Sequence, residues 1–382
     1  MRERGTTKHE LVRRAVQADI ESGRWGPGER LPSEAELVEQ FGVSRITVGR
    51  AMRDLQEAGV VDRRPGSGTY VSHPVSESGL SFGLLIPDLG ETEIFEPICQ
   101  GMMSSPLAQR HALVWGSPSG GSGRREERAW HLCRQYAERG VSGVFFAPLE
   151  LVPAKDEINE RISRELEAAG IPVVLLDRTV TPYPERGPHD LVGIDNRRAG
   201  YVMTEHLIRG GARRIAFVGV PDAAATVGAR EAGYREALYR AGLPIDASLT
   251  RRLDPTDRPE VERLMAGAAP DGIVCANDRT AARLMHTLLE IGHDVPGAVR
   301  MVGIDDLEYA ELLPVPLTTY RQPTRQIGAE ALAVMLERVE RPDLPIRDIL
   351  LHGEMVVRRS CGASTRHRRS GGRTVDRQRV VR

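Results

Sequence analysis

The sequence predicts a small α+β domain at the N-terminus, joined to a larger doubly wound α/β domain. Two short amphipathic helices and a glycine-containing hairpin follow one another between residues 31 and 71. From residue 81 onward, short apolar runs alternate with helical segments, which is typical of parallel strands buried on both faces. Residues 73–80, between the two parts, are polar and contain Pro74 and Gly79, so this segment has the composition of a linker.

The N-terminal part contains two helices separated by a tight turn. Ser33 and Glu36 have the spacing of a capping box, in which each side chain satisfies a backbone N–H at the helix start. Gly42 ends this helix, and Ser44 supplies the N-cap of the next one. An amphipathic helix over residues 9–20 precedes the pair. Helix pairs that bind DNA are joined in this way.

The second helix of the pair has an apolar stripe and a separate polar surface. Val48, Leu55 and either Ala51 or Met52 recur at helical spacing and are expected to face inward. The side chains left for the other surface are Arg45, Thr47, Arg50 and Arg53. An arginine fork on such a surface can bond guanine O6 and N7 together. For Arg53, a solvated surface charge with no role is an equal alternative.

A hairpin follows the helix pair. Residues 60–61 and 69–71 are predicted strands around the segment RRPGSG, whose glycines permit a turn against phosphates. The helices and this hairpin together predict a winged helix-turn-helix.

This stretch resembles the GntR-type winged helix, whose pattern runs LPSE, then GVSR-x-TV, then GxGTxV, and the resemblance covers roughly residues 8–72. It implies DNA contacts at the helix starts and in the wing, from Ser33, Ser44, Arg45, Thr47, Arg50, Gly66 and Gly68. Ala35 and Gly49 depart from the pattern, because many members carry a DNA-contacting arginine at these places. Either the protein binds a different set of bases, or Arg50 and Arg53 compensate.

The N-terminal DNA-binding part of the chain, here called the head, has a net charge close to zero. Residues 1–73 hold 12 Lys plus Arg against 11 Asp plus Glu. One head alone is expected to bind DNA weakly, because the phosphate contribution to affinity scales with the number of basic groups engaged. A homodimer on a two-fold symmetric double-stranded operator is therefore predicted.

Composition excludes several classes of protein. The chain has 382 residues and is 40% hydrophobic, as expected for a globular protein of two or three domains. It lacks an apolar run of the about 20 residues that span a bilayer, and its N-terminus lacks a signal-peptide core, so a cytoplasmic location is expected. The four cysteines lack metal-ligand spacing, so free thiols, no metal and no cofactor are expected.

The predicted strands of the larger domain begin at residues 82, 112, 143, 172, 191, 214, 271 and 300. Doubly wound sheets bind small ligands at the carboxyl ends of their strands. Several of these runs are followed by polar residues, namely Asp88, Asp177, Arg178, Asn277, Asp278, Asp305 and Asp306.

The order of several segments resembles the LacI-type sensor, which shares its fold with sugar-binding proteins. The segments are IPVVLLDR, VGIDNRRAGYVMTEHLIRGGARRIAFVG, AREAGYREAL, IVCANDRTAARLM and VRMVGIDDLEYAELLPVPLTTYRQP, and the likeness extends over most of residues 81–361. A GntR-like head joined to such a sensor is similar to the arabinose-responsive repressor type. The resemblance implies a regulator with a two-lobed domain of the periplasmic-binding-protein type.

This resemblance places the effector-binding residues at Asp88, Phe95, Asp177, Arg230, Asn277, Asp305 and Gln322. Carboxylates, amides and an arginine fork suit vicinal hydroxyls, so the mixture indicates a sugar or polyol. Two or three carboxylates around one arginine favour a neutral ligand. A nucleoside or purine effector is the alternative.

Most of these residues also have simpler explanations. The alternative for Asn277 and Asp305 is that they cap the following helices, the alternative for Asp177 is a pair with Arg178, and the alternative for Phe95 is a place in the core. Arg230 is the exception, because a positive charge near a helix start opposes the helix dipole.

By resemblance, the chain crosses between the lobes near residues 193–196, 320–323 and 350–355. A ligand that touches both lobes would favour closure, and closure would alter the spacing of the two heads. Release from DNA is predicted, with promotion of DNA binding as the alternative. Residues 93–116 and 279–292 are expected, again by resemblance, to form the dimer surface.

Residues 362–382 contain seven arginines and one acidic residue, and they are predicted to be disordered. This tail either adds nonspecific phosphate contacts or is a solvated extension without a role.

Two rival classes are disfavoured. Some GntR-like heads are fused to pyridoxal phosphate enzymes, but Lys155 is the only lysine outside the head and no glycine-rich phosphate loop accompanies it. An exported solute-binding protein would carry a signal peptide where this chain has a DNA-binding head. Enzyme activity is therefore not expected.

Overall fold

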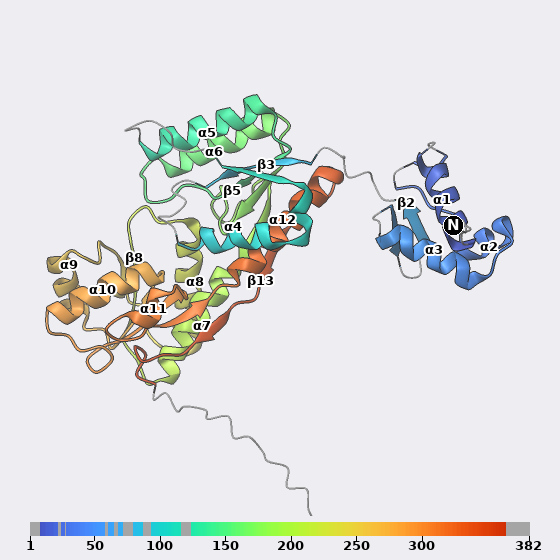
Figure 1. Cartoon of the computed structure of the whole chain (residues 1–382). Coiled ribbons are helices and arrows are strands. Elements are labelled where there is room, and N and C mark those ends of the chain that lie inside the picture. Colours follow the sequence, from blue (N-terminus) through green and yellow to red (C-terminus); the bar gives the residue numbers. More distant parts are fainter. Residues whose placement is uncertain are drawn as a thin grey trace, which may run out of the picture. The chain divides into compact units, whose positions relative to one another are not determined.

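The computed structural model of the chain describes residues 8–21, 24–26, 28–57, 60–64, 68–71, 79–86, 93–115 and 124–363. It divides into two compact units, the head (Met1–Leu80) and the sensor (Ser81–Arg382) (Figure 1). Most of the predicted linker and nearly all of the arginine-rich tail lie outside the described residues.

The described part of the head contains three helices and an antiparallel hairpin, so the predicted winged helix-turn-helix is confirmed (Figure 1). Its elements are α1 (Lys8–Glu21), α2 (Glu34–Phe41), α3 (Arg45–Glu57), β1 (Val61–Arg64) and β2 (Gly68–Val71). They share one apolar core made of Val12, Val16, Leu31, Leu37, Val48, Ala51, Met52, Leu55, Val61 and Val71. The predicted inward stripe of α3 lies in this core.

The predicted capping box closes the start of α2. The Ser33 N–H donates to Glu36 Oε2 at 2.7 Å, and the Glu36 N–H donates to Ser33 Oγ at 3.3 Å. Gly42 ends the helix with φ at +62°, a left-handed conformation that glycine adopts without steric cost. Local sequence therefore determines where the turn between α2 and α3 begins.

In the residues that the structure describes, the sensor has two six-stranded sheets, each at the centre of one lobe. The first sheet has the order β13-β7-β6-β5-β3-β4, and all of its described pairs are parallel. Its strands are β3 (Ser81–Leu85), β4 (Ala112–Trp115), β5 (Gly143–Phe146), β6 (Val173–Leu176), β7 (Asp190–Ile194) and β13 (Asp348–Leu351).

The second sheet has the order β14-β12-β11-β10-β8-β9, with β14 antiparallel to β12 and the other described pairs parallel. Its strands are β8 (Ile215–Gly219), β9 (Thr250–Arg252), β10 (Gly272–Cys275), β11 (Arg300–Asp305), β12 (Thr318–Arg321) and β14 (Glu354–Val356). The two sheets confirm the predicted two-lobed, doubly wound α/β fold.

Helices cover the sheets. The first lobe has α4 (Phe95–Ser104), the 3-10 turn η1 (Pro106–Arg110), α5 (Arg125–Arg139), α6 (Lys155–Ala168) and α12 (Thr324–Glu340). The α5/α6 pair and the α4/α12 pair lie on opposite faces of the first sheet (Figure 1). The second lobe has α7 (Asn196–Arg209), α8 (Ala225–Arg240), η2 (Ala247–Leu249), α9 (Arg258–Arg263), the π turn η3 (Leu264–Ala268), α10 (Asp278–Glu290) and α11 (Tyr309–Leu312).

Each of the eight apolar runs contains a strand, but the structure adds β9, β12, β13 and β14, which the sequence did not predict. Of these, β9, β13 and β14 are edge strands, which need no continuous apolar run because one edge or face meets solvent. Strand β12 is buried but threonine-rich. Its Thr319 hydroxyl donates to Asp278 Oδ1 at 2.6 Å, so a hydrogen bond replaces the expected apolar contact.

The chain passes between the lobes three times, from β7 to α7, from β12 to α12 and from β13 to β14. These crossings fall at residues 194–196, 321–324 and 351–354, close to the predicted positions. Each lobe is therefore assembled from separated stretches of sequence.

Glycines let the main helix pairs of the sensor approach closely. A Cβ on Gly200 of α7 would collide with the carbonyl oxygen of Arg230 on α8, and a Cβ on Gly233 of α8 would collide with that of Arg197. In the first lobe, Gly101 of α4 meets the backbone of α12 in the same way. Close packing against α7 thus fixes the backbone that carries Arg230.

Candidate functional site

The start of α3 presents polar side chains to solvent. The Arg45 side chain is 84% exposed, and its Nε lies 3.7 Å from a carboxylate oxygen of Glu34. Ser44 Oγ accepts from the Thr47 N–H at 3.3 Å and lies 2.9 Å from the Thr47 hydroxyl, so this pair caps the helix. Arg50 is also exposed. These residues form an accessible surface at the N-terminal half of the helix predicted to read DNA.

The other predicted DNA contacts flank this surface in the sequence. Ser33 is exposed, but its hydroxyl lies 2.8 Å from Glu36 Oε2, so the side chain serves the capping box. Gly68 begins β2 with φ at +128°, and a Cβ there would lie 2.8 Å from Arg30 Nε. The absence of a side chain at this position therefore lets the wing approach Arg30. Gly66 lies outside the described residues and stays a prediction.

Sequence reasoning missed Ile46. Its side chain lies between Arg45 and Thr47 along the chain and is 82% exposed, although α3 has a well-filled apolar face on its other side. An isoleucine in this position gains nothing from the head's core, but it suits contact with a thymine methyl group in the major groove. The missed signal was an apolar residue that falls outside the inward stripe.

A cavity of about 220 Å³, here named the central cavity, lies between the lobes of the sensor. Its walls include predicted site residues from both sheets. Asp177 follows β6 of the first lobe, whereas Asn277 follows β10, Asp305 ends β11 and Arg230 lies on α8 of the second lobe. The structure therefore brings four predicted residues together at the carboxyl ends of the strands.

Arg230 is buried and held by three groups. Its Nε donates to Asn196 Oδ1 at 2.8 Å, its Nη1 donates to the Ala276 carbonyl at 2.6 Å, and its Nη2 lies 3.6 Å from Asp305 Oδ1. Burial raises the pKa of Asp305, and the neighbouring Arg230 opposes that shift. Asp305 also has φ at +134°, a backbone strain that commonly marks a functional position.

The first lobe contributes a second buried arginine, Arg178, which the sequence suggested only as a partner of Asp177. Its Nη1 lies 2.7 Å from Glu150 Oε1, and its Nε lies 3.5 Å from Asp177 Oδ2. Burial raises the pKa of Asp177, with Arg178 acting against it. In Glu150 burial acts in the same direction, but Arg178, the Ala224 N–H and Arg230 together outweigh it, so the pKa is lowered. This lobe thus balances its own buried charges.

Three predicted residues lie elsewhere. Phe95 lines neither this cavity nor its neighbour. It is buried, with the Arg178 guanidinium 5.2 Å from its ring centre, so it supports that arginine from behind. Gln322 lines the neighbouring cavity described below, and Asp88 lies outside the described residues. Asn277 caps α10, because its Oδ1 accepts from the Thr280 N–H at 2.8 Å, and it also lines the central cavity, so its predicted contact with the effector stays a prediction.

The charge balance expected from the sequence needs correction. Among the described residues, five arginines and four carboxylates line the central cavity, rather than one arginine among two or three carboxylates. The lining residues not predicted include Arg125, Glu150, Arg279 and Arg283. Arg279 and Arg283 stand one turn apart on α10 and are exposed, so they belong to the rim. Their helical spacing was visible in the sequence, but their direction was not.

The lobes touch beside the central cavity. The Leu151 N–H of the first lobe donates to the Asp222 carbonyl of the second lobe at 2.7 Å, and the Ala224 N–H donates to Glu150 Oε2 at 3.3 Å. Leu151 and Asp222 both have positive φ, at +60° and +51°. The two strained turns therefore meet where lobe motion would separate them.

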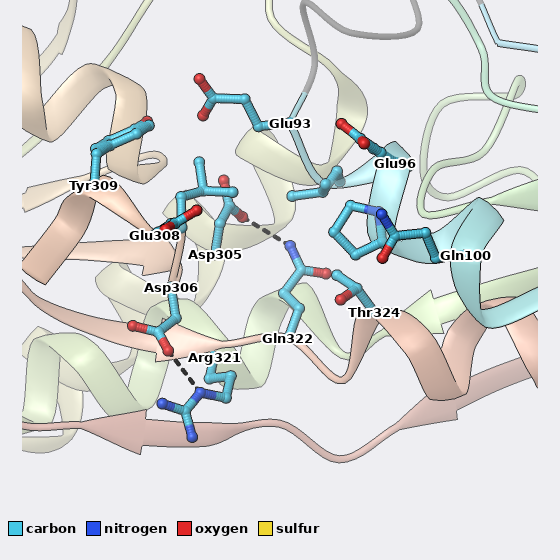
Figure 2. A pocket seen from close by; sticks show the side chains of 13 residues that line it. Glu93, Glu96, Gln100, Asp305, Asp306, Glu308, Tyr309, Arg321, Gln322 and Thr324 are labelled. Carbon is cyan, nitrogen blue, oxygen red and sulfur yellow. Dashed lines mark hydrogen bonds and ion pairs between the residues drawn. The ribbon is translucent and has the colours of Figure 1, made fainter. Parts of the chain in front are cut away.

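A second cavity of about 520 Å³ adjoins the central one (Figure 2). Four residues line both: Glu93, Ile94, Asp305 and Leu307. Gln322 lies in its wall and donates from Nε2 to Asp305 Oδ1 at 2.7 Å (Figure 2). The second cavity is therefore a polar extension of the same interlobe space.

Other kinds of site find no support among the described residues. They contain no group of three or more His, Cys, Asp or Glu side chains placed to hold a metal ion. Within the same ranges, no helix has the length and apolar character needed to cross a bilayer. All four cysteines are buried free thiols.

Comparison with known proteins agrees with this architecture. Residues 8–71 match the gntR family of bacterial regulatory proteins, and residues 204–361 match the periplasmic binding protein-like domain. The chain is 27% identical to the arabinose metabolism transcriptional repressor of Geobacillus stearothermophilus, over 94% of this chain and 99% of the relative. It is 30% identical to the HTH-type transcriptional repressor PurR of Aliivibrio salmonicida, over 60% of this chain and 67% of the relative.

A solved structure titled as a transcriptional regulator CelR-cellobiose complex matches with a TM-score of 0.62 and 26% identity, over 83% of this chain and 91% of that one. A DNA-binding head joined to an interlobe cavity defines a transcription regulator rather than an enzyme. The chain belongs to the regulators that join a GntR-type head to a LacI-type, periplasmic-binding-protein-like sensor.

Proposed function

We propose that the protein is a repressor that binds operator DNA as a homodimer and is released when a small neutral sugar or polyol binds in the central cavity. The observation that carries this proposal is that Arg230, Asp305, Asn277 and Asp177 line one cavity, where they combine a fixed, buried donor fork with acceptors from both lobes. Vicinal hydroxyls both donate and accept, so they match such a set.

The charges of the cavity support an uncharged ligand even though arginines are numerous. Arg178 is balanced by Glu150 and Asp177, and Arg230 faces Asp305. A phosphate placed between these pairs would meet carboxylates as well as guanidinium groups. The exposed rim arginines are screened by solvent, so they contribute less than the buried pairs.

A sugar is favoured over a nucleoside or purine by the shape of the wall. No aromatic side chain is among the described residues that line the central cavity, and Phe95 lies behind Arg178 rather than at its surface. A flat base would lack a ring to stack on. The names of two similar proteins point the same way, since one is an arabinose metabolism repressor and another was solved with cellobiose.

The proposed control of DNA binding by the ligand rests on contacts to both lobes. A sugar that bonds to Asp177 of the first lobe and to Arg230 of the second favours one lobe arrangement over others, and only such a difference in affinity shifts the equilibrium. The contact between Leu151 and Asp222 lies beside the cavity, where it would respond to that shift. The head spacing in the dimer then changes, and operator affinity falls. In the alternative, an effector bound in the same cavity would promote DNA binding.

Dimer formation is part of the proposal. The head's near-neutral charge makes one head a weak binder, and residues 93–116 of the first lobe carry three half-exposed apolar side chains, Met103, Leu107 and Trp115. Exposed apolar groups of this kind suit a protein surface. The second predicted segment, residues 279–292, contains no large exposed apolar side chain. Such a regulator would act with the chromosome in the cytoplasm.

A thermal-shift screen of the full chain with pentoses, hexoses and nucleosides tests the ligand class. Binding to the native state stabilises it by mass action and so raises the melting temperature. At a free ligand concentration of 100 times Kd, the free energy of unfolding rises by about 2.7 kcal/mol. We expect a sugar to respond, Arg230→Ala to abolish the response, and Arg235→Ala on the same helix to retain it. A response to nucleosides alone would contradict the sugar assignment.

A further inference from the structure

The second cavity is larger than the central cavity with which it shares its wall. The central cavity measures about 220 Å³ and the second about 520 Å³. Clefts that bind small molecules usually measure about 300–1,000 Å³. The central cavity alone falls below that range, whereas the two together fall within it.

The wall of the second cavity contains a buried acceptor that lacks a donor. Gln322 is 4% exposed, and its Nε2 donates to Asp305. Its Oε1 is buried and has no hydrogen-bond partner among the described residues. Figure 2 places this amide in the middle of the wall, between Asp305 and Thr324. A buried carbonyl oxygen left unpaired is unfavourable, so a donor from a ligand would stabilise it.

The charged groups around the second cavity are mostly acidic. Asp306 is neutralised, because its oxygens lie 2.6 Å from Arg321 Nε and 2.7 Å from Arg358 Nη1. By contrast, three exposed carboxylates at the rim form no ion pair with any described residue: Glu93, Glu96 and Glu308. Burial, reinforced by Glu93, raises the pKa of Tyr309, so its hydroxyl stays protonated. This wall accepts hydrogen bonds from hydroxyls and repels anions.

We propose that the effector has two linked sugar units, and that the second unit occupies the second cavity and donates a hydrogen bond to Gln322. The inference rests on the proposed function, which assigns the first unit to the central cavity. Asp305 lines both cavities and accepts hydroxyls from either unit. The effector class is therefore a neutral disaccharide, rather than a free monosaccharide or a sugar phosphate.

Isothermal titration of the full chain with matched sugars tests this inference. The pairs are glucose with cellobiose, galactose with lactose, xylose with xylobiose and arabinose with arabinobiose, and glucose 6-phosphate serves as the anionic probe. We expect one disaccharide to bind at least about tenfold more tightly than its own monosaccharide, because each about 1.4 kcal/mol of added contact is a factor of ten. A monosaccharide that binds as tightly as its disaccharide would overturn the inference alone, whereas a preference for the phosphate would also contradict the neutral ligand of the proposed function. If no sugar in the panel binds, the proposed function fails with it.

Two variants locate the second unit. Thr324 lines the second cavity and is absent from the central one, so Thr324→Phe would fill the space and lower disaccharide affinity at least about tenfold while monosaccharide affinity stays unchanged. Gln326→Phe, on the exposed side of the same helix, is the control. Unchanged disaccharide affinity in Thr324→Phe would overturn the inference.

The rim provides a test that does not depend on a core substitution. Glu308 is exposed, so Glu308→Gln is expected to fold normally and to weaken disaccharide binding about threefold, because a hydrogen bond to a charged acceptor is stronger than one to a neutral acceptor. Glu311→Gln, one turn further on and outside the cavity, is the matched control. Equal effects of the two variants would count against the second cavity as a sugar site.

Discussion

The head and the sensor hold their arginines in opposite environments. The Arg45 side chain of the head is 84% exposed, whereas the Arg230 side chain of the sensor is 4% exposed and is held by side-chain and backbone oxygens. A DNA surface is large and arrives with its own charges, so an exposed arginine can meet it without prior desolvation. A small effector offers few contacts, and each must be made by a group that is already fixed and largely dry.

This difference predicts how the two regions respond to substitution. Removal of an exposed arginine from the head should change DNA binding and leave stability intact. Removal of a buried arginine from the sensor should change both effector binding and stability, because the carboxylates that it neutralises are left buried without a cation. The predictions below test that division, from the largest expected effect to the smallest.

The largest effect is expected for Arg230→Ala. The substitution leaves the Asp305 carboxylate buried without its cation and should lower the free energy of unfolding by about 3–5 kcal/mol. Urea denaturation of the full chain measures this loss, with exposed Arg235→Ala as the control. Arg230→Lys keeps the charge but loses the fork, so it should recover stability without recovering effector binding. A fully stable Arg230→Ala variant would contradict the structural role of this residue.

His189 gives the sensor a stability that depends on pH. Burial lowers the pKa of this imidazole to about 4, and its Nε2 lies 2.6 Å from the Ser163 hydroxyl. The pKa of this imidazole is about 6.5 in the unfolded chain and about 4 in the folded one. The contribution of neutral His189 to stability is therefore complete above pH 6.5 and is lost as the pH falls from 6.5 to 4.

The loss should reach about 3 kcal/mol between pH 6.5 and pH 4, as measured by urea denaturation at several pH values. His189→Gln should flatten this part of the profile, while His131→Gln, at an exposed position, should not. An unchanged slope in His189→Gln would assign the acid sensitivity to other groups.

In the head, Arg45→Ala should weaken operator binding by about 1–3 kcal/mol per head without lowering the melting temperature. The exposed ion pair with Glu34 contributes little to stability, so its loss should not destabilise the fold. Fluorescence anisotropy on an operator selected from random duplexes measures affinity, and Arg14→Ala on α1 is the control. A large drop in melting temperature would break the proposed division between head and sensor.

The smallest effect is expected for Ile46→Ala. Loss of an apolar contact with a thymine methyl should cost about 1 kcal/mol or less, and only on operators that carry thymine at the contacted position. Competition between operators that differ at single base pairs would measure this. An equal loss on every operator would indicate that Ile46 does not read a base.

The sequence predicted the head more completely than the sensor site for a physical reason. The capping box and the Ser44 cap act between residues within four positions of each other, so the pattern alone specifies them. Edge strands such as β13 escaped prediction, because partial exposure relaxes the demand for apolar residues. Seven of the eight strands that apolar runs predicted are central in their sheets, and β4 is the exception because it lies at an edge.

In the sensor, the ends of central strands led to Asp177, Asn277 and Asp305, and the structure brings these together. The other half of the wall depends on how the two lobes meet, which no local pattern encodes. Glu150, which the sequence did not predict, lies in the wall and forms an ion pair with Arg178. Phe95, which was predicted to line the site, lies behind that arginine. The nearly balanced arginines and carboxylates emerged only once the segments were assembled.

The central claim is that a sugar bound between the lobes releases the operator. Fluorescence anisotropy of a labelled operator with the full chain, titrated with the sugar identified by thermal shift, tests it most directly. We predict that anisotropy falls with increasing sugar in the unmodified protein and in Arg235→Ala, and stays constant in Arg230→Lys. Operator binding that remains equal or strengthens as sugar is added to the unmodified protein would contradict the claim.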